Sequence, residues 1–213
     1  EPYTWRSGSS QLLRRKQLML GSVLFHVGVL IIFGGHFVGL LTPIEVFDSI
    51  GVSHGAKQVL AIIAGGIAGA MAIVGALILL HRRVFDPRIR ATSNFGDTAI
   101  LALLTAQLVL GLSTIPLSSQ HLDGSEMVKF MAWAQGIFTF QPGAAAHISE
   151  VHWIFKAHLA LGLTIFLVFP FTRLVHMLSA PIWYLNRRGW QLVRTRRDMA
   201  DQKGRARPSR GGR

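Results

Sequence analysis

Four long, uncharged apolar segments constrain this chain more than any other feature of its sequence. A helix needs roughly 20 apolar residues to cross a bilayer core of about 30 Å, because lipid cannot satisfy free backbone N–H and C=O groups. Residues 18–41 and 59–80 meet this requirement, 98–115 can extend at both ends, and 157–172 continues past Arg173 to His176. With 50% hydrophobic and 15% charged residues, the 213-residue chain has too little polar surface to cover these segments in a soluble core. We therefore predict an all-α integral membrane bundle with four transmembrane helices.

The basic residues indicate how such a bundle is oriented. Of the 22 Lys and Arg residues, four precede the first segment, four lie between the second and third, and eleven run from Arg173 onward. By the positive-inside rule these three groups face the cytoplasm. We expect a basic cytoplasmic arm at 1–17, a transmembrane domain at 18–178 and a basic cytoplasmic tail at 179–213, with a disordered end that can touch anionic membrane lipid. The charges border membrane spans and form no single recognition surface, which argues against nucleic acid as a partner.

Three further features concern the segments and their connections. The small residues of 64–76 allow helices or a flat ligand to approach closely, and plain helix packing explains most of them. Residues 129–140 indicate an interfacial helix that carries a Trp. Pro170 is expected to kink the last span. The chain has no cysteine, which excludes disulfides, cysteine-ligated iron–sulfur clusters and thioether-attached haem within it.

Two of the nine histidines lie in the first span, His26 and His36, and two in the last, His158 and His176. Ionisable residues inside a membrane are costly, so they are functional candidates by default. On a continuous helix the 18 residues between His158 and His176 make about five whole turns, so both point the same way about 27 Å apart. The ten residues between His26 and His36 give about 15 Å of rise and roughly 80° of rotation.

Antiparallel first and last spans would pair these histidines by depth. His26 and His176 fall near the cytoplasmic side, whereas His36 and His158 fall near the outer side. Two imidazoles on facing helices form a bis-histidine site for non-covalent b-type haem, so we predict two haems, with Gly28, Gly34 and Gly35 relieving crowding beside them. Two alternatives remain open: four unrelated hydrogen-bonded histidines, or a transporter that uses them as a proton relay.

Two basic residues near these pairs are further candidates. Lys57 lies at the start of the second span near the outer depth, where its ammonium is placed to hydrogen-bond a quinone oxygen. An interfacial lysine that extends to water is the alternative. Arg173, three residues before His176, is a candidate partner for a haem propionate, or an anchor at the inner face.

Four stretches of the sequence resemble the gamma subunit of respiratory nitrate reductase: LFHVGVLIIFGGHFVGLLTP, HRRVFDPRIRATSNFGD, LGLSTIPLSSQHLDGSEMVKFMAWAQ and FKAHLALGLTIFLVFPFTRLVHMLSAP. The resemblance runs from about Tyr3 to Arg197. It implies a diheme cytochrome b in which His26 and His176 hold the cytoplasmic-side haem and His36 and His158 the outer-side haem. Lys57 matches the lysine of the family's quinol site.

The same resemblance implies partners and a location. Menaquinol or ubiquinol would be oxidised beside the outer haem with protons released outside, and electrons would pass inward to an iron–sulfur beta subunit and a molybdenum alpha subunit that reduces nitrate. The protein would be a multi-pass protein of the bacterial inner membrane with a cytoplasmic C-terminus. The family has five transmembrane helices, and this sequence begins where the first one ends, so we expect four. A diheme cytochrome b of another quinone-linked oxidoreductase is the related alternative.

Overall fold

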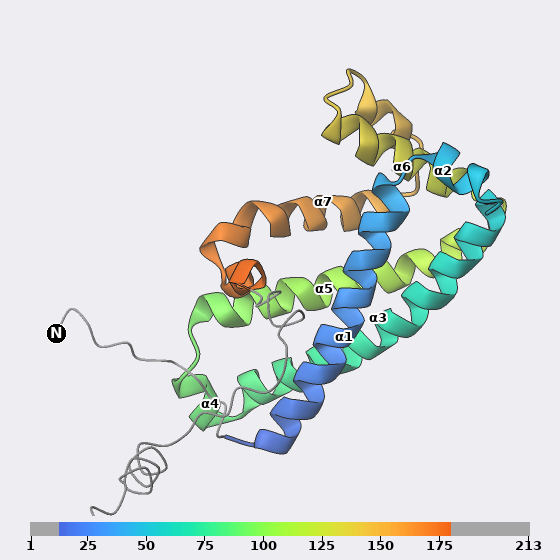
Figure 1. Ribbon diagram of the computed structural model, residues 1–213. Coiled ribbons are helices and arrows are strands. Elements are labelled where there is room, and N and C mark those ends of the chain that lie inside the picture. The colour runs from blue at the N-terminus through green and yellow to red at the C-terminus, as the bar shows by residue number, and fades with distance from the viewer. Residues whose placement is uncertain (1–12, 180–213) are drawn as a thin grey trace, which may run out of the picture. The chain divides into compact units, whose positions relative to one another are not determined.

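The four predicted spans are all helices in the computed structural model, which describes residues 13–179 (Figure 1). They are α1 (Arg15–Leu41), α3 (His54–Phe85), α5 (Phe95–Ser118) and α7 (Trp153–Val168). Each is long and apolar enough to cross a membrane, α7 together with the short 3-10 turn η2 (Phe169–Phe171) that follows it. The described residues contain no β-strand. The expected all-α membrane bundle is confirmed.

Shorter elements connect the four long helices. Helices α2 (Ile44–Ser49) and α6 (Ser125–Phe138) lie with the 3-10 turn η1 (Ala144–Ile148) at one end of the bundle, which we call the α6 end (Figure 1). Helix α4 (Pro87–Ala91) lies at the opposite end, the α4 end. Helix α6 confirms the helix expected within residues 129–140. Its Trp133 is only 9% exposed, however, so this side chain packs inward and does not reach an interface.

Local sequence signals set the helix boundaries. The Ser53 Oγ accepts a hydrogen bond from the Ala56 N–H at 3.2 Å and so caps the start of α3. Asp86 ends α3 and caps α4, because its Oδ1 accepts hydrogen bonds from the N–H groups of Arg88 and Ile89 at 3.0 and 3.4 Å. Pro87 fits the first position of α4, where a helix leaves the N–H unpaired in any case.

The closest helix packing occurs between α1 and α3, where glycines replace larger side chains. A Cβ atom on Gly28 would lie 2.5 Å from the carbonyl oxygen of Ala68, and one on Gly75 would overlap the backbone of Phe25. The small residues of 64–76 therefore serve helix packing, as the sequence suggested. The expectation that Gly28 makes room for a haem is wrong, because its open side is filled by α3. Gly34 and Gly35 have no neighbour within 4 Å of an added Cβ, and their haem-facing role stays a prediction.

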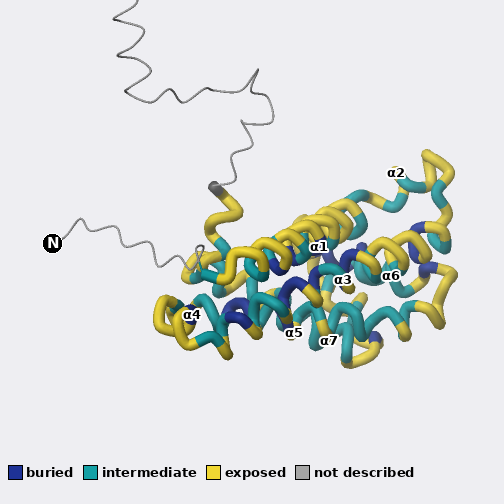
Figure 2. Tube along the Cα trace, turned by 90° about the horizontal axis from the view of Figure 1, so that it is seen from below, coloured by how far each residue is buried: buried dark blue, intermediate teal, exposed yellow. Residues whose placement is uncertain are grey.

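The spanning helices pack in chain order: α1 against α3, α3 against α5, and α5 against α7. Buried positions gather along α1, α3, α5 and α6, whereas α7 contains no buried residue (Figure 2). Large apolar side chains such as Leu30, Ile67 and Leu167 are exposed on these helices. Exposed apolar side chains on long spanning helices are what contact with lipid requires.

Pro170 ends the last α-helix and does not merely kink it. Helix α7 stops at Val168, η2 contains Pro170, Thr172 is extended, and a second 3-10 turn, η3, covers Arg173–Ser179. Proline lacks the N–H that an α-helix needs and its ring clashes with the preceding turn. The five-turn calculation from His158 to His176 is therefore wrong, since no continuous α-helix joins them. The chain divides into two compact units, Glu1–Val175 and His176–Arg213.

Candidate functional site

Two of the four candidate histidines face each other between α1 and α7. The ring centres of His36 and His158 lie 6.2 Å apart, and the ring planes are tilted by 48°. An iron held between two imidazole nitrogens, each about 2 Å away, places the ring centres about 6 Å apart. The spacing of this pair therefore fits the two axial ligands of one haem.

The two histidines of α1 are oriented by their own helix. The Nδ1 atom of His36 lies 2.8 Å from the carbonyl oxygen of Ile32, and that of His26 lies 2.7 Å from the carbonyl oxygen of Ser22. A carbonyl oxygen only accepts hydrogen bonds, so Nδ1 is the donor here, and in the neutral ring this tautomer places the lone pair on Nε2. Histidines that bind metals usually have this arrangement, with the second ring nitrogen bonded to a backbone carbonyl. In this tautomer Nε2 is the ring nitrogen with a lone pair, and iron binding by these two residues stays a prediction.

His158 has a different environment, formed by α5. The Gln107 Nε2 group donates a hydrogen bond to the carbonyl oxygen of His158 at 3.1 Å and lies 3.5 Å from the imidazole Nε2. A Cβ atom on Gly111 would lie 3.0 Å from the Cε1 atom of His158, so the ring packs directly on α5 at a glycine. Helix α5 therefore determines where the imidazole of α7 lies.

Lys57 is buried at the α6 end, with 7% of its surface exposed. Its Nζ atom lies 2.8 Å from the Sδ atom of Met131 on α6 and 3.7 Å from the ring centre of Phe47 on α2. The side chain does not extend to water, so the interfacial-anchor alternative is wrong. No carboxylate of the described residues lies within ion-pair distance of its ammonium, which contacts only a thioether and an aromatic face. A buried cation with such weak acceptors is well suited to bind an oxygen of a ligand.

Lys57 and the His36–His158 pair all lie near helix ends at the α6 end of the bundle. Lys57 is three residues from the start of α3, or about 5 Å along the helix axis, whereas His36 and His158 lie about 8 Å from the nearer ends of α1 and α7. These helix ends all lie on the side of the bundle where α6 is found (Figure 1). The expected combination of one histidine pair and Lys57 therefore lies at one end of the bundle.

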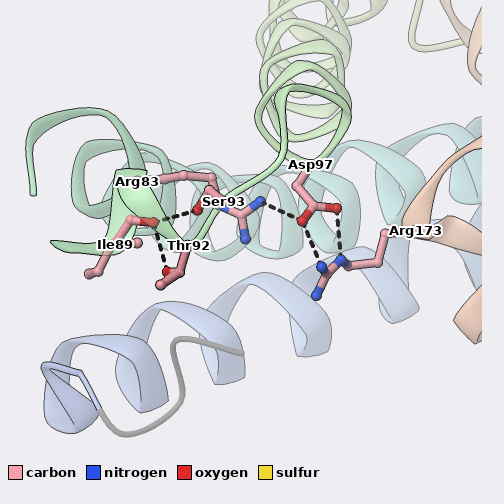
Figure 3. A network of polar contacts seen from close by, with 6 residues as sticks. All are labelled: Arg83, Ile89, Thr92, Ser93, Asp97 and Arg173. Carbon is pink, nitrogen blue, oxygen red and sulfur yellow. Dashed lines mark hydrogen bonds and ion pairs between the residues drawn. The ribbon is translucent and has the colours of Figure 1, made fainter. Parts of the chain in front are cut away.

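The other predicted pair, His26 and His176, stays a prediction. His26 belongs to the first compact unit, Glu1–Val175, and His176 belongs to the second, His176–Arg213. Arg173, the candidate propionate partner, pairs with a carboxylate of the chain itself: its Nε and Nη2 donate to Asp97 Oδ1 and Oδ2 at 2.8 and 2.6 Å (Figure 3). Contact of Arg173 with a propionate also stays a prediction.

Sequence reasoning missed three contacting residues: Gln107, Phe47 and Met131. A polar Gln inside an apolar span was a usable signal for the first, whereas the other two are apolar residues of short helices and carry no such signal. His152, six residues before His158, is the N-cap of α7, where its Nδ1 accepts a hydrogen bond from the Ile154 N–H at 3.3 Å. Among residues 13–179 no group of three or more His, Asp or Glu side chains is placed to hold a metal ion. A haem iron needs only two protein ligands, so a histidine pair suffices.

Comparisons with known proteins place the chain in a family. The family model described as "Nitrate reductase gamma subunit" matches residues 1–196. The chain is 51% identical over 194 residues to the respiratory nitrate reductase 1 gamma chain of Escherichia coli, a match that covers 91% of this chain and 85% of the relative. It is 39% identical over 187 residues to the nitrate reductase gamma chain of Bacillus subtilis, covering 88% and 83% of the two chains.

A more distant relative carries a different name. The chain is 24% identical over 168 residues to the Hdr-like menaquinol oxidoreductase cytochrome b-like subunit of Archaeoglobus profundus, which covers 78% of this chain and 48% of the relative. The family match and the two gamma chains agree with the four membrane-spanning helices and with the resemblance seen in the sequence. This chain belongs to the nitrate reductase gamma subunit family, whose members are subunits of an enzyme complex.

Proposed function

We propose that this chain is the diheme cytochrome b subunit that oxidises menaquinol or ubiquinol for a nitrate reductase complex. The observation that carries the proposal is the facing pair of His36 and His158, with ring centres 6.2 Å apart, at the same end as the buried Lys57. Two b-type haems, when bound by His36 with His158 and by His26 with His176, supply a one-electron path between the two membrane faces.

The role of Lys57 follows from its surroundings. Oxidation of a quinol requires the loss of its hydroxyl protons as well as its electrons, and a nearby ammonium stabilises the negative charge that develops on the oxygen. A quinol oxygen is a stronger acceptor for this ammonium than the Met131 sulfur is. Lys57 would therefore bind the quinol and promote release of its protons at the α6 end.

Charge distribution supports the orientation and the partners. The basic groups before α1, between α3 and α5, and from Arg173 onward favour a cytoplasmic C-terminus in a bacterial inner membrane. The α6 end then faces outward, and protons leave there. Electrons would leave at the cytoplasmic face to an iron–sulfur beta subunit and then a molybdenum alpha subunit, where nitrate is reduced.

The related alternative is a cytochrome b of another quinone-linked oxidoreductase. It is favoured by the name of the Archaeoglobus relative, and it uses the same haem and quinol chemistry with other partners. Affinity purification from native membranes separates the two readings by the subunits that accompany this chain.

The deciding experiment is a visible spectrum of the purified membrane protein, first oxidised and then reduced by a quinol, with haem measured per chain. Two b-type haems that the quinol reduces support the proposal. A folded protein without haem would contradict it and would favour the transporter with a histidine proton relay.

A further inference from the structure

His158 lacks the hydrogen bond that orients the two histidines of α1. On α1 the Nδ1–H groups of His26 and His36 donate to carbonyl oxygens four residues earlier. The Nδ1 atom of His158 is buried and has no hydrogen-bond partner among the described residues. A ligand histidine without a partner on its second nitrogen is unusual, because that hydrogen bond fixes both its tautomer and its ring orientation.

An unused acceptor lies beside this imidazole. The Oε1 atom of Gln107 is also buried without a partner in the described part of the chain. The amide nitrogen of Gln107 donates a hydrogen bond to the carbonyl oxygen of His158 at 3.1 Å. The same nitrogen lies 3.5 Å from the imidazole Nε2. One amide therefore contacts both the backbone and the ring of the same histidine, and its oxygen remains available.

Two glycines create the space for this contact between α5 and α7. A Cβ atom on Gly162 would lie 3.2 Å from the Gln107 Nε2 atom, and one on Gly111 would lie 3.0 Å from His158 Cε1. The interface thus places a polar amide and an imidazole against each other where apolar side chains would otherwise pack. Buried polar groups are normally paired, so two unpaired atoms on these neighbouring side chains call for a functional explanation.

We propose that Gln107 is the positioning residue of His158. In the haem-bound protein, Nε2 of His158 would hold the iron and the ring proton would lie on Nδ1. The Gln107 Oε1 atom would then accept a hydrogen bond from this Nδ1–H group. Gln107 thereby replaces the backbone carbonyl that serves His26 and His36. This inference rests on the proposed haem between His36 and His158.

The proposal has a measurable electronic consequence. An acceptor on Nδ1–H makes the imidazole a stronger electron donor, which favours ferric iron and lowers the reduction potential of that haem. Gln107→Leu removes the acceptor and should raise the potential. Gln107→Glu provides a stronger acceptor and should lower it. A merely structural role for Gln107 would not raise the potential in Gln107→Leu.

The test is a redox titration of the full complex in membranes, followed optically and by electron paramagnetic resonance, with haem counted per chain. Thr105→Val is the matched control, because Thr105 is buried on the same helix and, within residues 13–179, its hydroxyl donates only to the Leu101 carbonyl oxygen. We expect one haem to shift up in Gln107→Leu and down in Gln107→Glu, with the other haem and the Thr105→Val variant unchanged.

Each other outcome overturns a specific statement. Two haems with unchanged potentials, or with shifts in the same direction in both variants, would overturn the role of Gln107 and leave the proposed function intact. If Gln107→Leu loses haem, Gln107→Glu decides alone: a lower potential supports the proposal and an unchanged one overturns it. A wild-type complex without haem would overturn the proposed function and this inference together.

Discussion

Arg173 and Asp97 form a two-point ion pair that joins the start of α5 to the 3-10 turn η3. Both oxygens of Asp97 accept, from Nε at 2.8 Å and from Nη2 at 2.6 Å, and Arg83 of α3 lies 3.8 Å from the same carboxylate (Figure 3). The Asp97 side chain is 12% exposed and that of Arg173 is 55% exposed. One carboxylate near the α4 end therefore connects three segments of the chain, and the parallel two-point geometry fixes the direction of the Arg173 side chain.

Asp97→Asn should destabilise the protein by about 1–2 kcal/mol, since hydrogen bonds to charged groups contribute roughly that much and the exposure of Arg173 reduces the gain. The measurement is the thermal unfolding midpoint of the purified protein in detergent. Glu150→Gln, the same chemical change at an exposed position of the chain, is the control and should leave the midpoint unchanged. Equal midpoints for the two variants would show that the Asp97 contacts contribute nothing to stability.

The sequence predicted the long helices because membrane spans depend on runs of apolar residues, a local property. It also predicted that His36 and His158 would face each other. It failed at Pro170, where a kink and a helix end have the same sequence signal, so the rotation calculated between His158 and His176 did not apply. The burial of Lys57 and the contact of Gln107 with His158 depend on how separate elements pack, and no local pattern encodes that.

Lys57→Met should weaken quinol oxidation while both haems are retained. The substitution keeps a long, flexible side chain in the space bounded by Phe47 and Met131 but removes the ammonium. A lost hydrogen bond to a charged group corresponds to roughly a tenfold to hundredfold fall in kcat/KM for quinol. The measurement is the steady-state rate of the complex with a soluble quinol, with haem counted per chain.

The control for Lys57 is Lys129→Met on α6. Lys129 lies at the same end of the bundle, but it is partly exposed and pairs with Glu126 at 2.6 Å. Its loss should leave quinol kinetics unchanged. If Lys57→Met instead loses a haem, Lys57 is a structural residue; if both lysine variants behave alike, general charge at this end matters and a specific contact does not.

His36→Ala and His158→Ala should each remove the same single haem and abolish quinol oxidation. Under the proposed function each substitution would delete one of the two iron ligands, and the remaining imidazole alone would not hold a six-coordinate iron. Activity with artificial donors that feed the partner subunits directly should persist. His152→Ala is the control, because His152 caps α7 and should leave both haems in place. Unchanged quinol turnover in either ligand variant would refute the assignment.

Gly75→Ala and Gly65→Ala test the packing of α1 on α3 with one substitution at two positions of the same helix. An added Cβ at Gly75 overlaps the backbone of Phe25, which cannot move aside as a side chain can, so α1 must shift and the protein should lose about 1–3 kcal/mol of stability. An added Cβ at Gly65 meets no atom within 4 Å. There alanine should be neutral or should stabilise by up to about 1 kcal/mol, because it favours the helix more than glycine does. A thermal midpoint that falls for Gly75→Ala and not for Gly65→Ala would confirm that close backbone contact holds α1 on α3. Similar midpoints for the two variants would mean that α1 can adjust its position on α3 without loss of stability.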